Sequence, residues 1–103
     1  MPVTRRSESA SDLPNLLSPR DGSTVKQGGF TCRWQKVPDA AFYEVSIMTV
    51  SGDVVASRQT EEDSLNLGDL PVRSGARYFV SVRAHMHDGR TIRSNVVGFR
   101  VID

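Results

Sequence analysis

Two histidines, His85 and His87, stand two residues apart in a run that alternates apolar and polar side chains. Alternate residues of a β-strand point to the same side, so their rings are expected to share a face where both could ligate a metal ion. Zinc normally takes at least three protein ligands, and the chain offers no further Cys or His outside its expected core. The pair therefore predicts a solvated strand face and no metal site.

Cys32 is the single thiol of the chain and lies between Phe30 and Trp34 in an alternating run. A nucleophilic cysteine needs exposure and a neighbouring base that lowers its pKa. A thiol that is buried among aromatic residues behaves instead as a small apolar group. We expect Cys32 to belong to the core.

No other arrangement of residues indicates catalysis or a cofactor. Triads of serine, histidine and acid assemble in space, so spacing alone does not exclude one, but the chain has neither a nucleophile elbow nor a glycine-rich oxyanion loop. The acids at 61–63 fall in an expected loop. Gly28-Gly29 lacks the lysine and the helix of a phosphate loop. The sequence predicts a protein that is not an enzyme and binds no cofactor.

The elements that position these side chains must share one core, because 103 residues are too few for two independent cores. With one cysteine, no intrachain disulfide can form. Residues 1–12 are polar and serine-rich, which predicts a disordered tail or linker, and the domain is expected over residues 13–103. No run approaches the roughly 18 apolar residues that span a bilayer, so direct membrane insertion is not expected.

Strict alternation of apolar and polar residues predicts β-strands at 30–35, 42–50 and 78–87, each with one face in the core. A further alternating run closes the chain at 91–102. The residues expected to point inward are Phe30, Cys32, Trp34, Tyr43, Val45, Ile47, Thr49, Tyr78, Val80, Val82, Ala84, Met86, Val97, Phe99 and Val101.

Turn residues separate these runs. The segments 51–53 and 87–90 predict hairpins, 59–63 predicts a polar loop, and the two prolines within 13–19 favour an edge strand. No window shows helical spacing. About seven short strands, with turns every 8 to 12 residues or so, predict an all-β fold: an antiparallel two-sheet β-sandwich.

Charge is distributed unevenly along the chain, although the net charge is only +1. Residues 39–70 carry seven acids against one arginine, a balance of −6, and residues 71–103 carry six arginines against two acids, a balance of +4. We expect these segments to pair across strands. Nucleic-acid binding is not expected, because the domain lacks interleaved stacking aromatics and a net basic charge.

Trp34, Pro38-Asp39-Ala40 before Tyr43-Glu44-Val45, and the run from Gly75 to Ala84 resemble fibronectin type III and related immunoglobulin-like domains. In that family the Trp packs in the core, and the Tyr that opens the sixth strand forms a corner by bonding its hydroxyl to upstream backbone. The resemblance implies these roles for Trp34 and Tyr78. The chain departs from the family in the eight-residue step from Leu70 to Tyr78, which is longer than usual.

The resemblance extends to fibronectin-like domains of bacterial envelope and secreted proteins. It implies an extracytoplasmic setting, whether periplasmic, cell-surface or secreted. The expected function is a non-catalytic protein-interaction or spacer module of a larger protein, with an unidentified protein or neighbouring domain as partner. The alternative is a carbohydrate-contacting accessory module of a secreted hydrolase, for which Phe42 and Phe79 are the candidate exposed rings.

The outward face of the strand at 78–87 is the candidate interface. It carries Phe79 among charged side chains, which can mark a binding surface. A ring that stands alone or is covered by a neighbouring segment explains the same pattern. The expected interface residues are Phe79, Arg83 and His85, with Met48 and Glu44 on the neighbouring strand.

Overall fold

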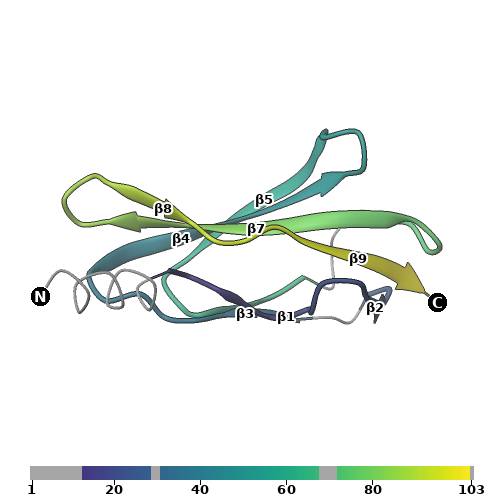
Figure 1. Cartoon of the computed structure of the whole chain (residues 1–103), viewed down its shortest axis with the longest axis horizontal. Coiled ribbons are helices and arrows are strands. Elements are labelled where there is room, and N and C mark those ends of the chain that lie inside the picture. Colours follow the sequence, from purple (N-terminus) through teal and green to yellow (C-terminus); the bar gives the residue numbers. More distant parts are fainter. Residues whose placement is uncertain (1–12, 29–30, 68–71, 103) are drawn as a thin grey trace, which may run out of the picture.

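The computed structural model of the chain describes residues 13–28, 31–67 and 72–102. These residues form nine β-strands in two sheets and no helix, which confirms the predicted all-β sandwich (Figure 1). The expected tail at 1–12 lies outside the described residues. The strands are β1 (Leu16–Ser18), β2 (Ser23–Lys26), β3 (Thr31–Trp34), β4 (Ala40–Thr49), β5 (Val54–Thr60), β6 (Ser64–Asn66), β7 (Arg77–Met86), β8 (Thr91–Arg93) and β9 (Val97–Ile102).

The smaller sheet has the order β1-β3-β6 and packs against one face of the larger sheet, which has the order β2-β9-β7-β4-β5 (Figure 1). Strands β8 and β9 both pair with β7: β9 pairs with its first part, and β8 pairs with its last part. Described pairings are antiparallel except that of β2 with β9, which is parallel. The long central strands β4 and β7 run side by side over nearly their full length.

The core lies between the sheets and contains most of the side chains that were predicted to point inward, together with four that were not: Val37, Ala56, Leu67 and Val72. Trp34 is 1% exposed and packs edge-on against Tyr43, with ring centroids 5.5 Å apart. Thr49 is only half-buried, because it lies at the end of β4, and Phe30 lies outside the described residues. The other predicted core residues are buried: Cys32, Val45, Ile47, Tyr78, Val80, Val82, Ala84, Met86, Val97, Phe99 and Val101.

Two tyrosine hydroxyls hold loops to the sandwich. Tyr78 accepts a hydrogen bond from the Arg73 amide at 2.8 Å, which is the corner that the resemblance implied. Tyr43 accepts one from the Val37 amide, also at 2.8 Å. Each hydroxyl satisfies a backbone donor that precedes a long central strand, so the entries to β4 and β7 are both anchored by side chains.

The predicted hairpins are confirmed. In the β4–β5 turn Gly52 adopts φ 95°, a left-handed conformation that glycine enters without steric cost, and its amide donates to the Thr49 carbonyl. The β7–β8 turn closes through a hydrogen bond from the Met86 amide to the Arg90 carbonyl.

The structure differs from the sequence expectation in three strands. Strand β5 continues to Thr60, into the segment expected to be a loop, because its backbone stays paired with β4 as far as Tyr43. Strand β2 was not predicted, since its strand character comes from pairing with β9 and not from its own pattern. The closing run is split at residues 94–96 into β8 and β9.

Candidate interaction surface

The five predicted interface residues lie on one face of the larger sheet, which we call the outward face because it points away from the smaller sheet (Figure 1). The register of β4 and β7 sets Glu44 opposite Arg83, and Met48 opposite Phe79. All five are half-buried, and their neighbours along each strand belong to the core. A binding role for this face remains a prediction.

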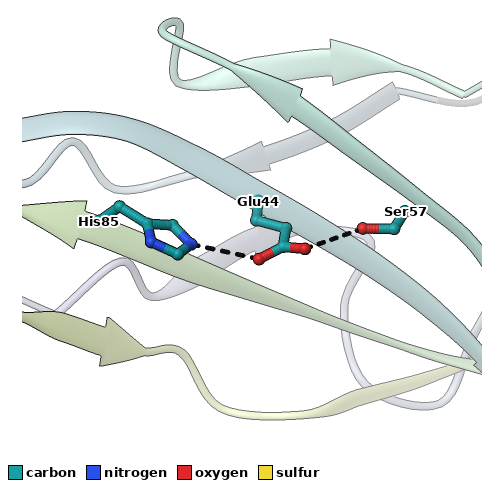
Figure 2. Close-up of polar contacts among 3 residues, drawn as sticks. All are labelled: Glu44, Ser57 and His85. Atoms are coloured by element: carbon teal, nitrogen blue, oxygen red, sulfur yellow. Dashed lines mark hydrogen bonds and ion pairs between the residues drawn. The ribbon is translucent and has the colours of Figure 1, made fainter.

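Glu44 lies at the centre of a polar network that spans three strands. Figure 2 shows its carboxylate between His85 on β7 and Ser57 on β5. One oxygen accepts a hydrogen bond from His85 Nε2 at 3.2 Å, and the other accepts one from Ser57 Oγ at 3.1 Å. These two bonds, with the nearby charge of Arg83 as a smaller contribution, lower the pKa of Glu44 below its ordinary value of 4.5.

The same three side-chain types could suggest a catalytic triad, but their order does not allow one. In a triad the histidine lies between the serine and the acid, so that it can take the serine proton. Here the carboxylate lies between Ser57 and His85, and Ser57 donates to Glu44 directly. A carboxylate with a lowered pKa is a poor base, so the arrangement orders the surface without activating Ser57.

His85 is further oriented by Phe42. The two rings are stacked, with centroids 4.4 Å apart and planes 9° from parallel. Phe42 was considered only as a ring for carbohydrate, and its stacking on His85 was not foreseen. The signal was present in the sequence: both residues belong to the outward sets of their strands, and the register makes them cross-strand neighbours.

Phe79 is held against the backbone of Gly98 on β9, its cross-strand partner. Phe79 Cε1 lies only 3.1 Å from the position that a Cβ atom would take at Gly98. The Gly98 amide donates to Asp21 Oδ1 at 2.8 Å, and the Gly98 carbonyl accepts from the Gly22 amide. Gly98 lies on the outward face opposite Phe79, and it is buried where the Phe79 ring packs against it.

Two hollows of the outward face lie on either side of the Met48–Phe79 row, and a further one opens beside Phe42 and Gln59. The first has a volume of about 510 Å³ and the second of about 200 Å³. The first is lined by Asp21, Gly22, Ser23, Thr24, Arg77, Phe79, Gly98, Phe99 and Arg100. The second is lined by Glu44, Ser46, Met48, Val54, Ser81, Arg83, Arg93 and Val96.

The acidic and basic segments do not pair as expected. Between described residues of the two segments, the one contact within 4 Å between an acidic and a basic side chain joins Glu44 to His85, whose side chains are 28% and 26% exposed. Most of the acids lie in turns and loops, such as the β4–β5 turn and residues 61–63, whereas most of the arginines lie on strands. Four of these arginines lie on strands of the larger sheet and have no acidic partner within 4 Å among the described residues: Arg77, Arg83, Arg93 and Arg100.

The remaining candidates for chemistry are placed as follows. Cys32 is fully buried, and this burial raises the pKa of its thiol to about 12, as expected of a core residue. His87 lies beyond the end of β7, in the turn, and not on the strand beside His85. Within residues 13–28, 31–67 and 72–102, no three side chains of His, Cys, Asp or Glu gather as a metal site would require.

Comparisons with known proteins bear on the fold. No family model matches the sequence, and no curated protein sequence is significantly similar to it. Among solved structures, a fibronectin(III)-like module of CbhA from Clostridium thermocellum aligns with a TM-score of 0.61 at 19% identity, over 87% of this chain and 96% of the module. The fold is that of a fibronectin type III-like β-sandwich.

Two further structures share this fibronectin type III-like arrangement. CopC from Methylosinus trichosporium OB3b aligns at 21% identity and a TM-score of 0.59, over 86% of this chain and 93% of CopC. A beta-1,2-glucanase from Parabacteroides distasonis aligns at 14% identity and a TM-score of 0.59, over 88% of this chain but 14% of the enzyme. At these identities the likeness concerns the fold.

The described part of this fibronectin type III-like chain holds no helix with the length and apolar character to cross a bilayer.

Proposed function

We propose that the chain is a non-catalytic interaction module that meets a protein partner, or a neighbouring domain, through the outward face of its larger sheet. The observation that carries this proposal is the asymmetry between the two faces of that sheet. One face is covered by the smaller sheet and fully used by the core. No described strand covers the other face (Figure 1). That face holds the hollows on either side of the Met48–Phe79 row and two exposed valines, Val54 and Val96.

The side-chain order of Ser57, Glu44 and His85 supports the non-catalytic part of the proposal. The three side chains bond to one another, and Glu44 lies beside Ser57 where a triad would place the histidine. A network that fixes the side-chain conformations before binding reduces the conformational entropy that these side chains lose when a partner binds.

Site-specific photo-crosslinking tests the proposal. A benzophenone amino acid replaces Val54 on the outward face, or Leu17 on the smaller sheet, in the full-length polypeptide within the producing cell. The two positions are matched, because both are aliphatic and their exposed fractions are 63% and 56%. We expect a discrete adduct from position 54 and none from position 17. Equal adducts, or none from position 54, contradict the proposal.

A carbohydrate-contacting accessory module is the second candidate, favoured by the likeness to part of a beta-1,2-glucanase. The positions of the two phenylalanine rings disfavour this function, because aromatic residues that bind sugars present a free ring face to the sugar. Phe42 stacks on His85, and Phe79 lies against Gly98. Affinity electrophoresis in gels that contain soluble β-glucans is the test, with Phe42→Ala as the variant. Retardation that Phe42→Ala abolishes would favour the carbohydrate module.

We further propose an extracytoplasmic location, supported by the likeness to fibronectin-like domains of envelope and secreted proteins. Protease protection in intact cells that produce the full-length polypeptide tests it. Degradation by external protease before the cytoplasm is opened is expected, either in intact cells or after permeabilisation of only the outer layer, whereas protection until the cytoplasm is opened contradicts it.

A further inference from the structure

Four arginines of the outward face form two opposed pairs. On β7, Arg83 is the Cα partner of Arg93 on β8, and Arg77 is the partner of Arg100 on β9. Like charges that lie directly opposite each other across strands are destabilising. A surface that repeats this arrangement twice is therefore suited to an anion that bridges each pair.

The described residues provide no carboxylate for either pair. None of the four arginines has an acidic partner within 4 Å among them. Glu44, the acid opposite Arg83, directs its oxygens to His85 and Ser57 instead. Asp21, the acid that lines the first hollow, accepts a hydrogen bond from the Gly98 amide. The acids that line the two hollows thus already accept other hydrogen bonds.

Each pair lines its own hollow. Arg77 and Arg100 line the larger one, and Arg83 and Arg93 line the smaller one. Arg77 and Arg83 are six residues apart on one strand, which corresponds to about 20 Å at roughly 3.3 Å per residue. A ligand that fills both hollows must therefore be extended, with anionic groups near both of its ends.

Apolar side chains lie between and beside the pairs. Met48 and Phe79 form the row between the hollows, and Val54 and Val96 are exposed at the edge of the smaller one. Apolar walls of this kind suit the side chains of a polypeptide. They do not suit nucleobases, which need aromatic platforms for stacking. A second copy of this face would present arginines to arginines.

We propose that the outward face binds an extended, acidic polypeptide segment of a partner protein, with carboxylates in both hollows and aliphatic side chains across the Met48–Phe79 row. This inference rests on the proposed function, since it names the class of partner that the interaction module takes. Arginine and carboxylate form bidentate, charge-assisted hydrogen bonds, which favour an acidic partner over a merely polar one.

The probe is a capped peptide of about eight residues, long enough to span the two hollows, with two glutamates at each end and alternating valine and threonine between. It is titrated into the isotope-labelled full chain and followed by NMR. We expect shifts at outward residues such as Ser46 and Ser81, and weaker binding as salt rises from about 0.05 M to about 0.5 M. A peptide with glutamines in place of the glutamates should bind at least tenfold more weakly.

Charge reversal identifies the arginines that matter. Arg77→Glu with Arg100→Glu, and Arg83→Glu with Arg93→Glu, should each weaken peptide binding at least tenfold. The matched control is Arg33→Glu with Lys36→Glu, which makes the same change of charge at exposed positions on and beside β3 and should stay within about twofold of the unmodified chain. Equal losses in the control and the outward variants overturn the inference.

Other outcomes separate the inference from the function on which it rests. Tighter binding of a uronate oligosaccharide than of the peptide, or self-association of the chain through this face, overturns the acidic-segment proposal. Crosslinks from position 54 that persist in both charge-reversal variants also overturn it, yet they leave the interaction module intact. Absence of both peptide binding and crosslinks overturns the two together.

Discussion

The ring of Phe79 lies over the backbone of Gly98, so that Phe79 Cε1 would be 3.1 Å from a Cβ atom at residue 98. An aromatic ring that covers a cross-strand glycine restores the packing that the glycine lacks. Phe79 therefore has a structural reason to be half-buried, independent of any partner. Its replacement is a poor test of binding, because it would uncover Gly98 as well as change the surface.

Gly98→Ala should expose this relationship in a double-mutant cycle. In the unmodified chain the new methyl group meets the Phe79 ring, and we expect a loss of up to about 1 kcal/mol in the free energy of unfolding. In a Phe79→Ala background the clash is absent, and the same change should stabilise by about 0.4–1 kcal/mol through the unfolded chain. Urea denaturation of the four proteins measures both values. An equal effect in the two backgrounds would contradict the contact.

The sandwich could be predicted because apolar and polar residues alternate along its strands, and this pattern indicates which side chains are buried. Trp34, Tyr43 and Val82 all sit in runs whose polar neighbours face outward, and all are buried. Strand β2 was not predictable in this way. It is four residues long, and its parallel pairing with β9 joins segments more than 70 residues apart, which no local pattern reports.

Cys32 should be unreactive in the folded chain. Its thiol is fully buried, and desolvation raises its pKa to about 12, so almost no thiolate forms at neutral pH. We expect no modification by maleimide under native conditions and complete modification in denaturant, as read by mass spectrometry. Ser51→Cys, which adds an exposed thiol in the β4–β5 turn, should take one label per folded molecule. Labelling of Cys32 at the rate of that added thiol would show that the core is open.

The residues of the candidate surface could be predicted from the sequence, but the hydrogen bonds between them could not. Alternation placed Glu44 and His85 on outward faces, and the family's sheet order made their strands neighbours. The carboxylate's choice of partner depends on side-chain rotamers and on β5, which brings Ser57 to the other oxygen. The charge balance of the segments does not predict which partner Glu44 takes. It suggested pairs between the acids of residues 39–70 and the arginines of residues 71–103, which the described residues do not form.

The Glu44 network predicts a specific dependence of stability on pH. Hydrogen bonds from His85 and Ser57 lower the pKa of Glu44 in the folded chain below the 4.5 of the unfolded chain. Its stabilisation is therefore fully present above about pH 4.5 and is lost as the pH falls through the lower, folded pKa. For a partly exposed pair the loss should be under about 1 kcal/mol.

Glu44→Gln provides the comparison, because the amide keeps the shape and does not titrate. The free energy of unfolding should fall more steeply for the unmodified chain than for the variant between about pH 5 and about pH 2. NMR titration of the Glu44 carboxyl carbon gives its pKa directly. A value at or above 4.5 would be inconsistent with the two hydrogen bonds.

Ser94 should be the most sensitive polar side chain of the described core. It is 6% exposed and lies at the break between β8 and β9, where its hydroxyl replaces a backbone carbonyl. The hydroxyl oxygen accepts from the Val82 amide at 2.8 Å, and the hydroxyl donates to the Asn95 carbonyl. Ser94→Ala leaves the buried Val82 amide without a partner, which should cost about 1–3 kcal/mol of stability.

Ser81→Ala is the matched control for Ser94→Ala, since Ser81 lies on the same sheet but faces outward, and its loss should stay within about 0.5 kcal/mol. Denaturant unfolding compares the two variants, and hydrogen exchange reads the Val82 amide itself. In Ser94→Ala that amide should exchange much faster than those of Val80 and Ala84, which lie opposite Val97 on β9 and Ile92 on β8. If its protection were retained, water or a shift of β9 would have to satisfy the donor, and the side chain would not be what joins the two halves of the closing strand.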